Sequence, residues 1–255
     1  MFLLEDIERR HDGRPVLRVG HLALGEYGLT AVLGHNGSGK STLMSLLARQ
    51  DRPDRGRILL DGRDLGGLSQ KSLARQVAYL PQRLPPVAGL TVRELVALGR
   101  FAWRGALGRW TEADHGAVDR AMDETGCAGF AGQLADTASG GERQRAWIAM
   151  LLAQESPCLL LDEPTAALDL AHAHEVMQLL QRISRAGGRR VVVILHDINL
   201  ATRFADRIIA LHGGEMRFDG TPAELLNPGI LRDLYGIEMS LLARPGNDLP
   251  LAAVR

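Results

Sequence analysis

The stretch LTAVLGHNGSGKSTLMSLLARQ, residues 29–50, decides the fold class. It passes from a short apolar run through a glycine-rich loop to a segment with helical spacing of apolar residues, so it predicts a strand, a loop and a helix. Two further apolar runs, 158–161 and 191–195, end in the polar clusters DEPTAALD and HDIN. Such runs are typical of parallel strands buried on both faces. Because ligands bind at the carboxyl ends of these strands, we expect the three polar clusters at one edge of a sheet.

Composition narrows the functional classes. The 30 basic and 30 acidic residues balance, so no strong positive field exists to hold a nucleic acid. The apolar runs, such as 146–153, are much shorter than the roughly 20 residues that span a bilayer. The N-terminal MFLLEDIERR lacks the basic start of a secretion signal, so we expect a cytoplasmic chain. Cys127 and Cys158 are interpreted as small buried hydrophobes.

The glycine-rich loop fits the phosphate-binding pattern G-x-x-x-x-G-K-[ST]. Its glycines let backbone N–H groups converge on phosphate oxygens, and the following helix offers its positive end. Lys40 is predicted to supply a mobile charge to the β- and γ-phosphates, and Ser41 a hydroxyl to Mg²⁺. Apart from Lys40 and Lys71, every basic residue is arginine, so a specific role for Lys40 is expected. The candidate nucleotide-binding residues of this loop are Gly34, His35, Asn36, Gly37, Ser38, Gly39, Lys40, Ser41 and Thr42.

Two carboxylates follow the apolar run 158–161. Asp162 is predicted to hold Mg²⁺ directly or through water, and Glu163 to polarise an attacking water as a general base. A solvated acidic turn would be the better interpretation if the phosphate loop were absent. Farther upstream, the sequence SGGE at 139–142 opens a helical stretch. By itself it is a good helix cap, and it offers a second anion site of the same physical kind.

In this order the motifs resemble those of the ATP-binding cassette (ABC) family over nearly the whole chain. SGGERQR resembles the family signature, which implies nucleotide contacts for Ser139, Gly140, Gly141 and Glu142. YLPQ matches the Q-loop and implies roles in catalysis and Mg²⁺ binding for Gln82, and ALD places Asp169 in the D-loop. His196 matches the switch histidine, which would bond the γ-phosphate and hold Glu163 and its water.

Two positions depart from the family pattern. Ala138 stands where leucine usually precedes the signature serine, which is expected to loosen packing while signature function persists. His11 stands where the family places an aromatic residue that stacks on adenine, and an imidazole stacks with less area than tyrosine. His172 and His174, by contrast, lie two apart on a predicted helix and point to different faces, so we do not expect a metal pair.

The resemblance implies an α/β fold: a P-loop NTPase (RecA-like) core with a parallel sheet, a helical signature subdomain and a small antiparallel β portion. A hairpin is predicted within residues 208–218, joined at Gly213 and Gly214. The expected boundaries are an ABC ATPase domain over residues 1–236, with the core at about 1–85 and 156–220 and the helical subdomain at about 86–155, and a helical tail over 221–255.

The resemblance also implies an ATP hydrolase coupled to transport, with ATP and Mg²⁺ as cofactors. A second copy would pair head to tail, so that each signature closes over the other chain's phosphate loop. An integral-membrane permease would hold the pair at the cytoplasmic face of the inner membrane, and a substrate-binding protein would deliver cargo outside. DNA-repair members carry a long coiled coil between loop and signature, whereas here about 100 residues without sustained heptads intervene. Ribosome-associated members carry two cassettes in one chain, and this chain has one set of motifs.

The cargo is suggested by a narrower resemblance. Residues 74–110, SGGERQRAWIAMLLAQ and HDINLATRFADRIIALHGGEM are similar to the ATPases of bacterial ferric-siderophore importers, closest to the ferric hydroxamate (ferrichrome) system. Importers of haem and vitamin B12 share this architecture and are the alternatives. The resemblance implies that the cargo does not contact this subunit, so no residue of this chain would identify the cargo directly.

Overall fold

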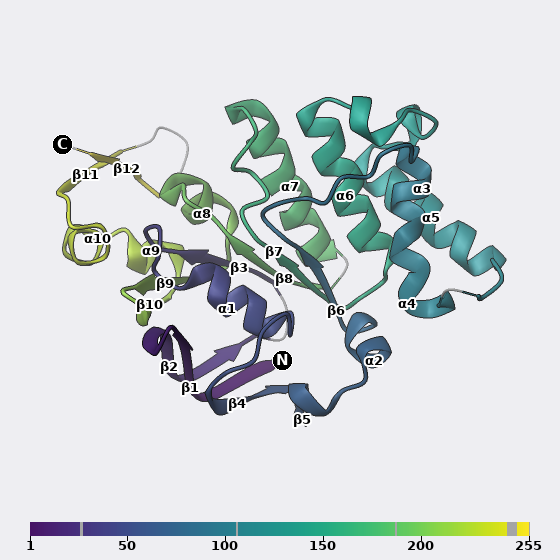
Figure 1. Cartoon of the computed structure of the whole chain (residues 1–255). Coiled ribbons are helices and arrows are strands. Elements are labelled where there is room, and N and C mark those ends of the chain that lie inside the picture. Colours follow the sequence, from purple (N-terminus) through teal and green to yellow (C-terminus); the bar gives the residue numbers. More distant parts are fainter. Residues whose placement is uncertain (26–27, 106, 187, 244–248, 255) are drawn as a thin grey trace. The chain divides into compact units, whose positions relative to one another are not determined.

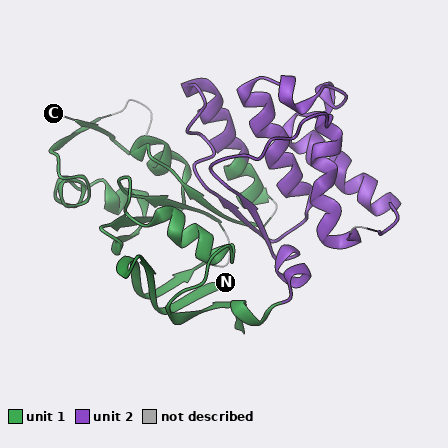
Figure 2. Cartoon of the chain, viewed as in Figure 1, with its two compact units in different colours: residues 1–68, 180–255 green, residues 69–179 purple. Residues whose placement is uncertain are grey.

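The computed structural model describes residues 1–25, 28–105, 107–186, 188–243 and 249–254. Two compact units divide the chain: unit 1 comprises residues 1–68 and 180–255, and unit 2 comprises residues 69–179 (Figure 2). Among the described residues, no helix is both long and apolar enough to cross a membrane.

Unit 1 is built on a mixed sheet with the strand order β5-β4-β1-β2-β10-β9-β3-β8 (Figure 1). The strand β3 pairs in parallel with β8 on one side and with β9 on the other. Every residue of β3 after Gly28 is buried, which explains the apolar run of the sequence. The strands of this sheet are β1 Phe2–His11, β2 Arg14–Leu24, β3 Gly28–Leu33, β4 Arg55–Leu60, β5 Arg63–Asp64, β8 Arg190–Ile194, β9 Arg207–His212 and β10 Glu215–Gly220.

The antiparallel part of this sheet includes the predicted hairpin. The strands β9 and β10 pair antiparallel from His212 opposite Glu215, so the hairpin prediction is confirmed. Gly213 and Gly214 form its turn with φ of 58° and 82°, a conformation that glycine adopts without strain. The helices of unit 1 are α1 Lys40–Leu47, the 3₁₀ turn η1 Leu65–Gly67, α8 Ile198–Phe204, α9 Pro222–Leu225 and α10 Pro228–Tyr235.

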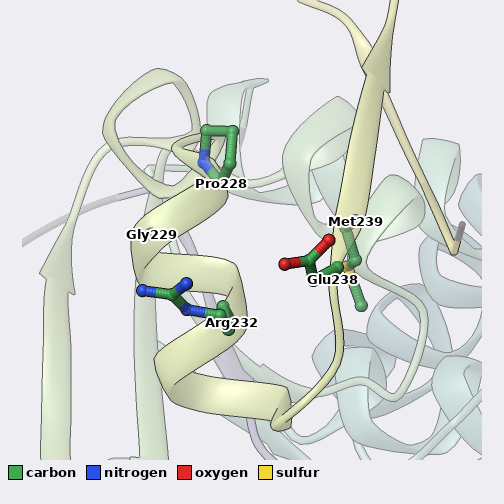
Figure 3. Close-up of a pocket in the computed structure, with 5 residues that line it drawn as sticks. All are labelled: Pro228, Gly229, Arg232, Glu238 and Met239. Carbon is green, nitrogen blue, oxygen red and sulfur yellow. The ribbon is translucent and has the colours of Figure 1, made fainter.

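The C-terminal tail, expected to be helical over residues 221–255, is helical in its first part. After α9 and α10 it forms two paired strands, β11 Met239–Leu242 and β12 Leu251–Val254. The side chain of Asn199 in α8 both donates to the Ala252 carbonyl (3.1 Å) and accepts from its N–H (2.9 Å), so β12 is fixed to α8. A pocket of about 250 Å³ lies beside α10 and the start of β11, and Figure 3 shows its lining residues Pro228, Gly229, Arg232, Glu238 and Met239.

Unit 2 combines two parallel strands with the predicted helices. The strands β6 and β7 pair from Val77 opposite Cys158 to Leu80 opposite Leu161. Capping boxes begin α3, α5 and α6, where a Thr or Ser side chain and an acidic residue three positions later bond each other's backbone. The elements are α2 Gln70–Ala74, β6 Val77–Leu80, α3 Val92–Ala97, η2 Leu98–Arg100, α4 Phe101–Arg104, α5 Glu112–Thr125, η3 Ala128–Phe130, η4 Ala135–Thr137, α6 Gly140–Ala153, β7 Cys158–Leu161 and α7 Leu170–Ala186, which continues beyond the unit.

A buried ion cluster joins the helices of unit 2. The Arg100 guanidinium donates to the Asp114 carboxylate (2.9 Å), to the Glu155 carboxylate (2.7 Å) and to the Ala153 carbonyl (2.8 Å). Only about 6% of the Arg100 side chain and 5% of the Asp114 side chain are exposed. Removing Arg100 would leave the buried Asp114 carboxylate without its ionic partner.

Cys127 and Cys158 are both buried, as predicted. The two compact units are divided at 68/69 and 179/180. The strands β6 and β7 are therefore grouped with the helices, in part because α6 packs against β6. The division into a RecA-like core and a helical subdomain stays a prediction.

Candidate functional site

The predicted phosphate loop runs from the end of β3 to the start of α1 in unit 1. Gly34 has φ of 146°, and a Cβ there would lie 2.3 Å from the Leu211 carbonyl oxygen. Gly39 has φ of 97° and caps α1, and a Cβ there would lie 2.9 Å from the Val16 carbonyl oxygen. Both positions require glycine because any side chain would be strained and would clash. The tight turn leaves the loop backbone close to the positive end of α1.

The loop wraps around the side chain of Lys40, which is only 5% exposed. Its ammonium donates to the Gly34 carbonyl (2.8 Å) and to the His35 carbonyl (3.0 Å). A buried ammonium needs such acceptors, and phosphate oxygens could replace them. The Ser38 hydroxyl is buried in the same loop and has no hydrogen-bond partner among the described residues. This arrangement fits a ligand rich in acceptor oxygens.

The remaining loop residues lie at the surface. His35, Asn36, Gly37 and Ser41 are exposed, and Thr42 is half-buried on the first turn of α1. The His35 ring Nδ1 lies 2.7 Å from the Asn36 carbonyl oxygen. Since exposed groups here surround a buried ammonium, the loop can receive a ligand from solvent.

His196 leaves the sheet at the same edge as the phosphate loop. The strands β3 and β8 run parallel with Val32 opposite Ile194, and the Leu195 N–H donates to the Val32 carbonyl (3.2 Å). The next residue, Asp197, caps α8 by accepting from two backbone N–H groups. Within unit 1, the prediction that the phosphate loop and the HDIN cluster lie at one edge of the sheet is therefore confirmed. His196 is exposed and directly precedes the residue that caps α8.

In unit 2, the parallel strands β6 and β7 bring Gln82 and Glu163 together. The Gln82 side-chain amide donates to a Glu163 carboxylate oxygen at 2.6 Å. Asp162 is buried, 4% exposed, and its N–H donates to the Leu80 carbonyl (2.9 Å). Glu163 has φ of 52°, in the left-handed region that non-glycine residues seldom adopt. Residues in such strained conformations cluster at functional sites. The neighbouring residues must stabilise this conformation of Glu163, because it costs free energy.

The signature segment begins α6. The Ser139 hydroxyl accepts from the Glu142 N–H (3.3 Å), and the Glu142 carboxylate accepts from the Ser139 N–H (2.9 Å). That backbone N–H, together with the serine hydroxyl, holds the pKa of Glu142 below its ordinary value. Ala138 is buried beside this cap. Glu142 therefore serves the helix start, while Ser139 and Gly140 are exposed at its positive end.

His172 connects the signature segment to Asp169 of the D-loop, a role not predicted from the sequence. Its backbone N–H donates to the Asp169 carboxylate (2.9 Å), and its ring Nδ1 lies 2.8 Å from the other oxygen. These two contacts lower the pKa of Asp169. The ring also packs on Gly141, where a Cβ would lie 2.5 Å from it. The spacing of three residues from Asp169 is the only sequence signal for this pairing.

The other predicted features are placed as follows. His11 ends β1 and has a side chain 79% exposed, with Nε2 lying 3.6 Å from its neighbour Asp12. No group of three His, Cys, Asp or Glu residues suited to a metal occurs in the described part of the chain. A pocket of about 560 Å³ in unit 2 is bordered by Gln82, by the start of α6 and by residues 163–168. The indole N–H of Trp147 borders it and has no partner within the described ranges.

Comparisons with known proteins agree with these motifs. The ABC transporter family profile matches residues 18–166. The achromobactin transport ATP-binding protein of Dickeya dadantii and the iron(3+)-hydroxamate import ATP-binding protein of Bacillus subtilis are each 40% identical over 223 residues, 88% of this chain and 83% of theirs. The hemin import ATP-binding protein of Streptomyces coelicolor is 40% identical over 233 residues, 91% of this chain and 82% of its own.

Solved structures give the same result. The inward-facing structure of a metal-chelate type ABC transporter has a TM-score of 0.86 and 25% identity, covering 100% of this chain and 97% of that chain. The dimeric structure of a bacterial ABC transporter cassette has a TM-score of 0.75 and 30% identity, covering 87% of this chain and 99% of that chain. The expected P-loop NTPase fold is confirmed by these likenesses. The chain belongs to the ABC transporter family, among its ATP-binding subunits.

Proposed function

We propose that this chain is the ATP-hydrolysing subunit of an importer that takes up iron(III) bound to a siderophore of the hydroxamate type. The observation that carries the hydrolytic role is the 2.6 Å contact between Gln82 and the strained Glu163. The cargo is supported by the relatives named for achromobactin and for iron(3+)-hydroxamate. The hemin relative is equally identical, so hemin import is the second candidate.

The phosphate loop supplies nucleotide binding. Lys40 would exchange the carbonyls of Gly34 and His35 for oxygens of the β- and γ-phosphates. The backbone N–H groups from Gly34 to Thr42 would bind the remaining oxygens at the start of α1. His11, which is exposed at the end of β1, would stack on adenine.

The proposed Mg²⁺ ligands fit that ion chemically. The Ser41 hydroxyl, the Asp162 carboxylate and the Gln82 side-chain oxygen are hard oxygen donors, which Mg²⁺ prefers. Gln82 uses its amide N–H on Glu163, so its oxygen is the atom left for a cation. The ion, when bound, neutralises phosphate charge.

Hydrolysis would use Glu163 as the base. A water oxygen attacks the γ-phosphorus, Glu163 accepts a water proton, and the bond from the γ-phosphorus to the bridging oxygen breaks to leave ADP and phosphate. His196 would bond the γ-phosphate and hold Glu163 and this water in position. Gln82 already orients the Glu163 carboxylate.

Two copies would bind two ATP molecules between them. Ser139 and Gly140, exposed at the start of α6, would close over the γ-phosphate held by the other chain, with Asp169 beside them. The dimeric cassette at 30% identity supports this pairing. ATP would then act as the adhesive of the dimer, and hydrolysis would release it.

A permease would hold the dimer at the cytoplasmic face of the inner membrane. The stretch from Gln82 to Trp110 is its proposed docking surface, because large apolar side chains are exposed there, with Phe101 62% and Leu107 99% exposed. A substrate-binding protein outside would deliver the cargo. No nucleic acid takes part in this scheme.

The test is uptake of radiolabelled iron in a strain that lacks the gene. We expect loss of ferric-hydroxamate uptake, while energy-independent binding outside is intact. Parallel assays with hemin and cobalamin identify the cargo. Lost hemin or cobalamin uptake with normal ferric-hydroxamate uptake would overturn the cargo assignment and leave the ATPase assignment standing.

A further inference from the structure

The turn between β9 and β10 contacts the phosphate loop directly. The Gly214 N–H donates to the Ser38 carbonyl (3.2 Å). On the same side, a Cβ on Gly34 would lie only 2.3 Å from the Leu211 carbonyl oxygen, so the loop also packs closely against the end of β9, which leads into this turn. A displacement of this turn would therefore displace the loop backbone.

A side-chain contact adds to this backbone contact. The ring of His212, the last residue of β9, meets the ring of His35 edge-on, with centroids 4.7 Å apart and an interplanar angle of 77°. His35 itself is an exposed residue. Its ring Nδ1 lies 2.7 Å from the Asn36 carbonyl oxygen. Edge-to-face packing is a favoured ring geometry, so His212 restrains a side chain that solvent alone would leave mobile.

His212 is itself fixed by the C-terminal tail. Its ring Nδ1 lies 2.9 Å from the Leu234 carbonyl oxygen, which belongs to the last turn of α10. Carbonyls of a last helical turn lack intrahelical partners, and a histidine N–H donor supplies one. Leu234 is buried, 2% exposed, so α10 offers a firm support.

The chain of contacts ends at the phosphate-loop lysine. The carbonyl of His35 is a loop acceptor of the Lys40 ammonium, at 3.0 Å. We propose that His212 is a positioning residue for ATP binding, which links α10 through His35 to the backbone that holds Lys40. A loop held in this way loses less conformational entropy when ATP binds. The proposal rests on the proposed role of Lys40 as a phosphate ligand.

The test measures KM and kcat for ATP in the purified full chain. His212→Ala is expected to raise KM about fivefold and to leave kcat within twofold, since loss of ground-state positioning affects binding rather than the chemical step. His212→Asn can keep a donor to the Leu234 carbonyl and is expected to recover part of the affinity. His35→Ala should raise KM similarly, and the double variant should add little, because both side chains act along one path.

The matched controls are His21→Ala, an exposed histidine of β2, and Arg232→Ala on the exposed face of α10. Both should have the KM of the unaltered chain. A KM unchanged in His212→Ala, additive effects in the double variant, or a reduced kcat with unchanged KM and a lowered melting temperature would overturn the proposal. If the unaltered chain shows no ATP hydrolysis, the proposed function fails instead.

Discussion

The two units differ in the atoms that bind their functional side chains. These are main-chain atoms in unit 1 and other side chains in unit 2. In unit 1 the Lys40 ammonium is bound by main-chain carbonyls, and Gly34 and Gly39 pack against main-chain oxygens. Main-chain acceptors do not change when neighbouring side chains are substituted. Function in unit 1 should therefore depend on the lysine, the glycines and the few side chains that fix the backbone.

In unit 2 the functional side chains hold one another. Gln82 bonds Glu163, and His172 bonds Asp169. The buried Arg100 follows the same rule within the helices. A single substitution in unit 2 should thus change the partner as well as the residue itself.

The largest effect is expected from Glu163→Gln. The amide fills the same space and can still accept from Gln82, but it has no basicity, so hydrolysis should fall about 10³-fold while ATP binding persists. The variant should accumulate as an ATP-bound dimer in size-exclusion chromatography. Glu175→Gln, an exposed carboxylate of α7, is the control, and turnover at the unaltered rate in Glu163→Gln would remove Glu163 from the role of base.

Arg100→Ala tests how much the buried ion cluster of Arg100 contributes to the stability of the fold. Leaving the Asp114 carboxylate buried without its partner should lower the free energy of unfolding by about 3 kcal/mol in urea titrations. Hydrogen bonds from Thr111 and Arg100 lower the pKa of Asp114, so its contribution is present at neutral pH and is lost as the pH falls below the ordinary carboxyl value of about 4.

The matched control for Arg100 is Arg93→Ala. Arg93 forms an ion pair with Asp119 at 2.7 Å in which both side chains are about half exposed. Such a pair contributes at most about 1 kcal/mol. Equal losses for the two variants would contradict the importance of burial in the Arg100 cluster.

Lys40→Arg probes the main-chain cage of unit 1. A planar guanidinium does not fit where the loop wraps a compact ammonium, so ATP affinity should fall roughly 10- to 100-fold despite the retained charge. Lys71→Arg is the control, because Lys71 is the other lysine of the chain and is exposed. Near-normal affinity in Lys40→Arg would mean that the lysine acts only as diffuse charge.

Gln82→Ala separates hydrolysis from transport. Loss of its bond to Glu163 should lower ATP hydrolysis by about tenfold, whereas iron uptake should fall further, because Gln82 lies where the proposed docking surface begins. Hydrolysis by the purified chain and uptake in cells are compared in one strain background. Arg83→Ala, the exposed neighbour, should change hydrolysis little. Parallel losses in both assays would argue against a coupling role.

The smallest effect is expected for His172→Ala. Asp169 would lose the imidazole that orients it, and the ATP-dependent dimer should weaken about two- to fourfold, since the pair is exposed. Analytical ultracentrifugation of ATP-bound Glu163→Gln protein, with and without His172→Ala, measures this. His174→Ala should have no effect, and an equal loss there would remove the special role of His172.

The features that the sequence predicts best are secondary structure, turns and burial. The strand, glycine loop and helix of residues 29–50, the β9–β10 hairpin and the buried cysteines all follow from periodicity, turn residues and composition. The helical stretch that SGGE opens is α6. These features depend on local patterns, which one sequence records.

Partner choices between side chains could not be predicted. The direct bond between Gln82 and Glu163 depends on the register of β6 against β7, and the His35–His212 contact joins residues brought together only by the sheet. The helices α9 and α10 agree with the helical tail that the sequence predicts, but the strands β11 and β12 that follow are too short to show alternation. The bond from His172 to Asp169 has only a three-residue spacing as its sequence signal, and that spacing alone does not select a partner.

The burial of both native cysteines has a practical consequence for observing two copies of the chain. Cys127 is fully buried, and burial raises the pKa of its thiol, while Cys158 is 1% exposed, so neither should react readily with maleimides. A cysteine introduced at Leu107, which is 99% exposed, would then carry a single dye or spin label per chain. In a dimer this gives one label-to-label distance, which would report opening and closing through the ATP cycle while both native cysteines are kept.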